Sequence, residues 1–249
     1  MQVVVDSLLT QYERVGKGRP VVILHGWADS SAGWQAFRSG LADTFDVISI
    51  DLPGFGGTEM PAMAWGLDEY AAFVSAFLKK IRVKPYALIG HSNGGAIAIR
   101  GLANGSLDAQ RLVLLDSAGI RSMYKGRNKI LRTITKTGKF VVMPLPKSVK
   151  RRLRKKVYKT VGSDMLVVEH LQETFKRVVT DDIQTNAAVL KPRTLLIYGE
   201  DDLATPIQYG RILHNLISGS TFEVIPEAGH FVHLDKPDVV LQRVRRFLV

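Results

Sequence analysis

Short apolar runs recur along the chain, and most are rich in Val, Ile, Leu, Phe or Tyr. Runs of this length that end at polar or turn-forming residues are typical of β-strands. From the third run onward they are nearly continuous in apolar residues, as expected for parallel strands buried on both faces of a sheet. The runs lie at 3–6, 9–15, 20–26, 45–51, 86–92, 111–117, 193–200 and 221–227.

Amphipathic patterns with helical spacing separate the later runs, at 32–41, 68–81, 94–103, 207–216 and 237–248. Strands that alternate with helices predict an α/β fold with a parallel sheet and right-handed crossovers. The first two runs meet at Asp6 and Ser7, which predicts a hairpin. We therefore expect a mostly parallel, twisted, eight-stranded sheet flanked by helices.

The segment between the sixth and seventh runs breaks this rhythm and carries most of the charge. The chain has a net charge of +11, and 17 of its 34 Lys and Arg residues lie in the range 121–184, against 5 of its 23 Asp and Glu residues. The charge therefore belongs to one segment rather than to the whole protein. We predict a core formed by 1–119 and 186–249, with a strongly basic helical cap inserted at 120–185.

The basic residues of the predicted cap have two interpretations. Val149, Leu153 and Val157 recur at four-residue spacing, so one helix face can pack on the core while the charges face water. The alternative is an acidic partner, such as an anionic membrane surface. No nucleic-acid recognition motif accompanies the charge, so we do not expect nucleic-acid binding.

Composition excludes several classes of chemistry. Cysteine is absent, which excludes disulfides and thiolate catalysis. No apolar run reaches the length that spans a bilayer, and the first residues lack the basic start of a secretory signal, so we expect a cytoplasmic protein. No histidine cluster has metal-ligand spacing, and the segment DLPGFGGT lacks the lysine of a phosphate-binding loop. We therefore expect neither a metal nor a cofactor.

The run at 86–92 ends in the pattern Gly-His-Ser-Asn-Gly at 90–94. A serine between glycines, after a predicted strand and before a predicted helix, fits the G-x-S-x-G nucleophile elbow. The glycines allow a tight turn that strains the serine and pushes its hydroxyl clear of the sheet. Ser92 is therefore the candidate nucleophile, and it needs a base that is held by a third group.

Five motifs follow one another along the chain: VVILHGW at 21–27, DLPGFGGT at 51–58, IGHSNGGAIA at 89–98, YGEDDLATP at 198–206 and IPEAGHFVHLDKP at 225–237. In this order they resemble the motifs of the α/β-hydrolase superfamily, in its capped subgroup of serine esterases and carbon–carbon bond hydrolases. The resemblance covers nearly the whole chain and is weakest in the predicted cap. It implies a serine hydrolase that needs no cofactor. Relatives that dehalogenate or open epoxides use an aspartate nucleophile, whereas this chain has a serine.

The resemblance assigns the base to His230, in a Gly-His loop after the last predicted strand. His233 lies three residues further on and is a rival. His25 and His91 flank the site, where the family pattern uses such residues for packing and hydrogen bonding. The remaining histidines, both in predicted helices, are His170 and His214.

For the acid, the family spacing between a glycine and a proline selects Asp202. The neighbouring Asp201 stays open, and so does Asp116, because some family members carry the acid after that earlier strand. The acid would hold the base in the right tautomer and stabilise its charged form. By the same resemblance, the backbone N–H groups of Trp27 and Asn93 form the oxyanion hole. Their side chains are free to line the pocket, and Asn93 replaces the commoner Leu or Met.

We expect a carboxylesterase that cleaves short to medium acyl esters through an acyl-serine intermediate. Thioesterase, lysophospholipase and carbon–carbon bond hydrolase activities stay open, because they would use the same three residues in a different pocket. A non-hydrolytic ligand receptor on the same fold is the alternative from another class of protein.

Overall fold

The computed structural model describes residues 1–121 and 171–249, and this part of the chain contains an eight-stranded sheet in the order β1-β2-β4-β3-β5-β6-β7-β8. β1 pairs antiparallel with β2 and β2 with β4, and the other neighbours are parallel. The predicted sheet and its opening hairpin are confirmed. The strands are β1 (Gln2–Val5), β2 (Leu8–Val15), β3 (Arg19–Leu24), β4 (Phe45–Ile50), β5 (Ala87–His91), β6 (Arg111–Leu115), β7 (Arg193–Gly199) and β8 (Thr221–Ile225).

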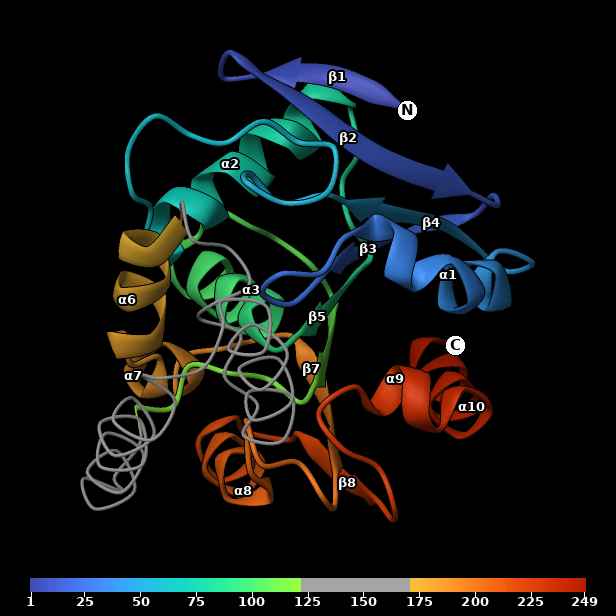
Figure 1. Cartoon of the computed structure of the whole chain (residues 1–249). Helices are drawn as coiled ribbons and strands as arrows, with labels where there is room; N and C mark the ends of the chain where they lie inside the picture. Colours follow the sequence, from blue (N-terminus) through green and yellow to red (C-terminus); the bar gives the residue numbers. More distant parts are fainter. Residues whose placement is uncertain (122–170) are drawn as a thin grey trace, which may run out of the picture.

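Helices cover both faces of the sheet (Figure 1). The short 3-10 helix η1 (Ser31–Trp34), α1 (Gln35–Leu41), α9 (Val232–Asp235) and α10 (Pro237–Leu248) pack on one face. The other face is covered by α2 (Leu67–Lys80), α3 (Asn93–Asn104), α6 (Gln172–Thr180), α7 (Gln184–Ala187) and α8 (Ile207–Leu216).

The central strands explain why the sheet has two cores. In β3, Val21 and Ile23 pack in the cluster that includes α1 and α10, whereas Val22 and Leu24 pack in the cluster that includes α2 and α3. All four side chains are completely buried. Side chains alternate between the faces of a strand, and each buried aliphatic side chain contributes about 1.5–3 kcal/mol. An apolar run without polar interruptions is therefore what this central position requires.

The helix predictions hold to within a residue or two at each end, and 207–216 and 237–248 are reproduced in full. The pattern at 32–41 divides into η1 and α1 rather than forming one helix. α3 is capped after its last residue by Gly105, whose φ of +77° is a left-handed conformation that glycine adopts without strain. α10 begins at Pro237, where the missing N–H of proline costs no helical hydrogen bond.

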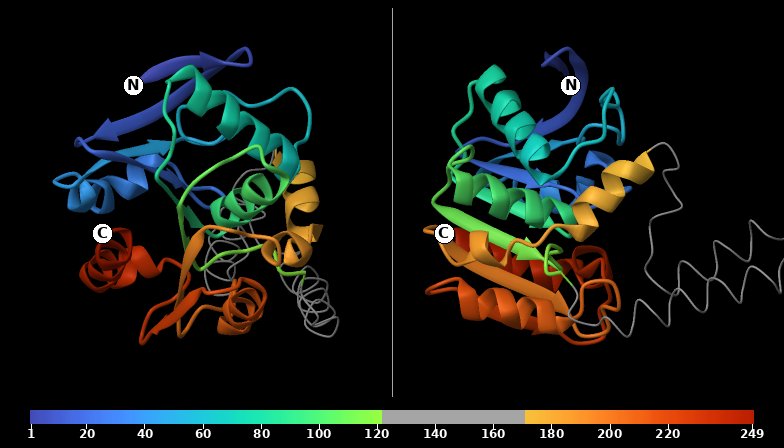
Figure 2. Two further views of the ribbon diagram at one scale, coloured as in Figure 1. Left: turned by 180° about the vertical axis from the view of Figure 1, so that it is seen from behind. Right: turned by 90° about the vertical axis from the view of Figure 1, so that its left-hand side faces the viewer.

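The described part of the predicted cap at 120–185 includes α6, which lies beside the loop that leads into α2 (Figure 2). The hydroxyl of Thr174 accepts the backbone N–H of Trp65 at 3.1 Å, and the Arg177 guanidinium donates to the carbonyl of Ala64 at 2.9 Å. This end of the segment is therefore anchored to the core.

The rest of the cap stays a prediction, since residues 122–170 lie outside the described residues. The same holds for the predicted apolar face of Val149, Leu153 and Val157, and for His170. In 1–121 and 171–249, no helix is both long and apolar enough to cross a membrane. These residues also contain no group of three or more His, Asp or Glu side chains that could hold a metal ion.

Candidate active site

Ser92 lies at the sharp turn between β5 and α3, beyond the carboxyl end of the strand. Its backbone has a φ of +48° and a ψ of −116°, a conformation that residues other than glycine rarely adopt. A Cβ on Gly94 would collide with the carbonyl oxygen of Leu24, and one on Gly90 would lie 2.5 Å from the Cα of Gly95. Glycine at both positions therefore permits the strained turn that presents the serine hydroxyl.

His230 lies in the loop between β8 and α9, and its Nε2 is 3.0 Å from the Oγ of Ser92. The loop is held in place by His91, whose Nε2 lies 2.8 Å from the backbone carbonyl of His230. A carbonyl oxygen can only accept a hydrogen bond, so His91 must carry its proton on Nε2. The ring of His91 thus supports the His230 loop.

Asp202 follows β7, and its Oδ2 lies 2.8 Å from the Nδ1 of His230. Its Oδ1 accepts the backbone N–H groups of Ala204 at 2.7 Å and Thr205 at 3.0 Å. The Thr205 hydroxyl is 2.6 Å from Oδ2. The carboxylate is buried and held from several sides, which fixes its orientation toward the imidazole. The structure therefore joins Ser92, His230 and Asp202 in one hydrogen-bonded chain.

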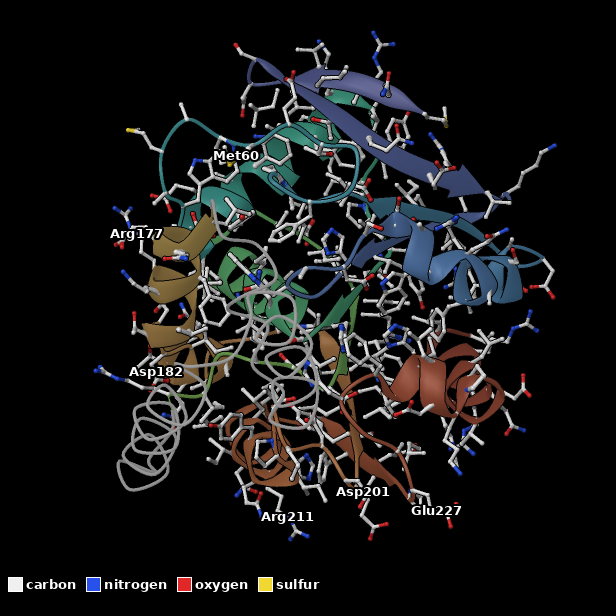
Figure 3. The ribbon with its side chains drawn as sticks, viewed as in Figure 1. Met60, Arg177, Asp182, Asp201, Arg211 and Glu227 are labelled. Atoms are coloured by element: carbon white, nitrogen blue, oxygen red, sulfur yellow. The ribbon has the colours of Figure 1, made fainter. Side chains whose placement is uncertain are left out.

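The two alternative acids, Asp201 and Asp116, have different surroundings. Asp201 is exposed, and its side chain points outward at the edge of the molecule (Figure 3). Asp116 is fully buried, but its two oxygens accept the backbone N–H groups of Gly199 at 2.8 Å and Val232 at 3.1 Å. Burial, and then the negative charge of Asp202, raise the pKa of Asp116 well above its usual range. Asp116 thus ties together the loops that follow β7 and β8.

Of two other histidines near the site, His25 is held by hydrogen bonds and His233 by packing. His25 accepts the backbone N–H of Leu52 on Nε2 at 2.9 Å, and its Nδ1 lies 2.7 Å from the carbonyl oxygen of Gly26. His233 is buried and stacks on Trp34, with 4.0 Å between ring centroids. Burial, and then the charge of His230, lower the pKa of His233 to about 3, so its ring is neutral near pH 7.

The backbone N–H groups of Trp27 and Asn93 lie on the loops that flank Ser92. Trp27 follows β3, and Asn93 is the first residue of α3, where helical N–H groups have no partner inside the helix. The two loops touch, since a Cβ on Gly26 would lie 3.2 Å from the Cβ of Ser92. Within the described residues, neither N–H donates to another group of the protein. Both are therefore available to a substrate oxygen.

A cavity of about 890 Å³ adjoins Ser92 and His230. One wall is aromatic, because the ring of Trp27 packs edge-on against Phe55 and Phe175, with 4.9 and 5.0 Å between centroids. Phe175 belongs to α6, so the segment after residue 170 closes one side of the site. Further apolar walls come from Ala96, Ala118, Ile120 and Val178.

Two features of the site were missed by the sequence analysis. One is Thr205, whose hydroxyl contacts Asp202 and lies 2.9 Å from the carbonyl of Asp116. Its place three residues after the acid and before a proline was the available signal. The other is the bridge that Asp116 makes between two loops, which depends on residues far apart in the sequence.

A comparison with known protein families matches residues 21–243 to the model of the alpha/beta hydrolase family. This chain belongs to the alpha/beta hydrolase family. The match spans the loop of Trp27, the elbow of Ser92 and the loops of Asp202 and His230. The family resemblance seen in the sequence motifs is thereby confirmed.

Individual alpha/beta hydrolases that resemble the chain differ in what they cleave. A 2-hydroxy-6-oxo-2,4-heptadienoate hydrolase from Pseudomonas putida is 23% identical, over 99% of this chain and 95% of its own length. The solved structure of an esterase from Exiguobacterium antarcticum has a TM-score of 0.81 at 20% identity, over 100% of this chain and 98% of that one. A membrane phospholipase A has a TM-score of 0.81 at 22% identity, over 100% and 84%. At such identities the structural likeness shows the fold alone.

Proposed function

We propose that the protein is a serine hydrolase that cleaves carboxylic esters of short to medium acyl chains. The observation that carries this proposal is the hydrogen-bonded chain from Ser92 through His230 to Asp202 beside a cavity. A serine hydroxyl is a weak nucleophile alone and becomes reactive when an oriented imidazole accepts its proton.

In the proposed reaction, Ser92 Oγ attacks the ester carbonyl while His230 Nε2 takes the hydroxyl proton. The carbonyl oxygen becomes an oxyanion that accepts the N–H groups of Trp27 and Asn93, and each such donor contributes about 2.7–4 kcal/mol to the transition state. His230 then gives the proton to the leaving alcohol. Water, activated by the same imidazole, cleaves the acyl-serine and restores the hydroxyl.

The cavity supports the preference for modest acyl chains. Ligand pockets commonly have volumes of about 300–1,000 Å³ and mostly apolar walls. The cavity of about 890 Å³ falls within this range, and several of its walls are aliphatic or aromatic. A short to medium chain can therefore bury its apolar surface there.

Related activities would use the same three residues. The sequence similarity to the heptadienoate hydrolase keeps carbon–carbon bond cleavage as the alternative to ester cleavage. Thioesterase and lysophospholipase activities are further alternatives. A panel of p-nitrophenyl esters of rising chain length, run beside acyl thioesters, a lysophospholipid and a dienoate, separates them. An ester preference that peaks at short to medium chains is the expected result.

A fluorophosphonate probe tests whether the protein is a hydrolase or a receptor. The probe phosphonylates a serine only when its hydroxyl is activated, so we expect one adduct, on Ser92. Peptide mapping by mass spectrometry locates the label, and heat-unfolded protein is the control that should remain unlabelled. Absence of label on the folded protein would favour a non-hydrolytic ligand receptor.

The basic segment 121–184 supports a separate proposal, that the protein binds an anionic surface or acidic partner. We expect that reversal of Arg151, Arg152, Lys155 and Lys156 to Glu leaves kcat on a small neutral ester within a few-fold. The same variant should lose binding to anionic vesicles, and wild-type binding should weaken as salt screens the charges. Co-sedimentation with vesicles of increasing anionic lipid content measures the effect.

A matched control for this charge reversal changes four exposed lysines of the core to Glu. These residues are Lys17, Lys79, Lys80 and Lys84. If the control loses as much vesicle binding as the cap variant, net charge alone explains the binding. If the cap variant loses its activity on the small ester while it stays folded, the basic segment takes part in catalysis, contrary to the unchanged kcat expected here. If it keeps its binding to anionic vesicles, the proposed binding role of these charges is wrong.

A further inference from the structure

Among the described residues, three buried polar side-chain atoms of residues that line the cavity have no hydrogen-bond partner. They are the indole nitrogen Nε1 of Trp27 and both side-chain polar atoms of Asn93, Nδ2 and Oδ1. In the described part of the chain, these are the two cavity-lining residues whose side chains carry such unpartnered atoms. Both residues also supply the N–H groups of the proposed oxyanion hole, and both line the cavity together with Ser92.

Neither side chain can relieve the deficit by turning to solvent. Trp27 is 7% exposed, and its ring is fixed between Phe55 and Phe175. Asn93 is 3% exposed and sits at the first position of α3, directly after the strained Ser92. The three polar atoms therefore stay unpaired within two side chains that line the cavity.

Buried polar groups in native proteins are almost always satisfied, and unsatisfied ones call for a physical explanation. A leucine at position 93 would fill similar space, would keep the backbone N–H and would leave nothing unpaired. We propose that the side chains of Trp27 and Asn93 form a polar subsite that binds a hydroxyl or amide group of the substrate close to the scissile carbonyl. The proposal rests on the proposed ester hydrolysis and adds the substrate class.

The chemistry of the three atoms defines that class. The indole and the carboxamide nitrogen donate, whereas the carboxamide oxygen accepts. A hydroxyl or a secondary amide both donates and accepts, so it matches both kinds of atom. A carboxylate offers no proton to the carboxamide oxygen, and a plain hydrocarbon chain would leave every atom unpaired. The subsite therefore selects neutral hydroxyacyl or acylamino esters over plain alkyl esters.

A pair of matched esters tests this with the wild-type protein. Phenyl 3-hydroxybutanoate and phenyl 3-methylbutanoate differ only by a hydroxyl in place of a methyl group. After each kcat/KM is divided by the rate constant for hydrolysis by hydroxide, we expect a preference of at least about tenfold for the hydroxy ester, because sites built to bind a polar group reject analogues that lack it. A second pair, 2-hydroxypropyl and 2-methylpropyl butanoate, places the same difference on the alcohol side.

Two substitutions test the assigned residues. Asn93→Leu keeps the backbone N–H of the oxyanion hole, and Trp27→Phe keeps an aromatic ring between Phe55 and Phe175. Each should bring the hydroxy-to-methyl ratio down by about tenfold, the effect of one lost hydrogen bond of this kind. The ratio is unaffected by a general loss of rate, since such a loss divides out. Val178→Ala reshapes the same cavity without removing a polar atom, and its ratio should equal that of the wild type.

These experiments distinguish an error in the proposed subsite from an error in the proposed function. If the wild type cleaves both members of each pair with corrected ratios near one, or if both substitutions leave the ratios unchanged, the subsite is refuted while ester hydrolysis stands. If no ester is cleaved, binding decides. The Trp27 indole N–H resonance, identified by its loss in Trp27→Phe, should then shift with phenyl 3-hydroxybutanoate and stay in place with the methyl analogue. Equal shifts, or none, would refute the subsite.

Discussion

Replacing Ser92 with alanine is expected to lower kcat for ester hydrolysis by up to about 10⁶-fold, the loss found when a triad nucleophile is removed. Without Oγ no acyl-enzyme can form, and His230 loses the group whose proton it would accept. The change should also abolish labelling by a fluorophosphonate. Initial rates on a p-nitrophenyl ester of the preferred chain length measure the loss.

The fold should survive this substitution. The Ser92 backbone donates to the carbonyl of Leu115 and accepts from the N–H of Ala118, and alanine keeps both hydrogen bonds. The positive φ strains serine and alanine alike, because both carry a Cβ. Circular dichroism and the melting temperature check this point. Full activity in a Ser92→Ala sample free of wild-type protein would show that Ser92 is not the nucleophile.

Ser117→Ala is the matched control for this experiment. Ser117 is a buried serine two residues after the neighbouring strand β6, and its hydroxyl lies 3.2 Å from the carbonyl of Ala118. Its loss should change the rate by no more than a few-fold. A comparable collapse of activity in both variants would indicate damage to the elbow rather than loss of a nucleophile.

The sheet could be predicted from the sequence because burial on two faces leaves a simple pattern. β5 has every residue buried and β6 has all but its first, and their sequences are apolar almost throughout. The elbow could be predicted for a local reason too. Gly90 and Gly94 mark a turn in which neighbouring side chains cannot fit, and that constraint is visible within five residues.

Other parts could not be predicted, because their causes are distant in sequence. The short helix α9 follows the His230 loop, and its first residue, Val232, donates its backbone N–H to Asp116 from more than a hundred positions earlier in the chain. The orphaned side-chain atoms of Trp27 and Asn93 are likewise a property of packing. The family spacing favoured Asp202 over two other candidate acids, but it gave no physical reason. The structure supplies one, because Asp202 is hydrogen-bonded to His230 whereas Asp116 accepts the backbone N–H groups of two loops.

Asp202→Asn is expected to lower kcat by about 10⁴-fold, the precedent for an amide in place of a triad carboxylate. The structure gives a reason. Oδ1 of Asp202 accepts two backbone N–H groups, from Ala204 and Thr205, so the amide oxygen of the substituted side chain would stay on that side. The NH₂ group would then face His230 Nδ1 and donate to it. His230 would carry its own proton on Nε2, toward Ser92, and could not accept another.

Asp116→Asn is the contrasting variant. An asparagine there keeps one acceptor for Gly199 or Val232 and turns an NH₂ group toward the other backbone N–H. Loss of such a buried hydrogen bond costs about 1–3 kcal/mol, so the melting temperature should fall, while kcat should fall far less than in Asp202→Asn. The two variants thus separate catalysis from loop support when kcat and thermal stability are measured together. If Asp116→Asn lowers kcat as much as Asp202→Asn at a temperature where both are folded, Asp116 is the acid that orients His230, and the choice of Asp202 is wrong.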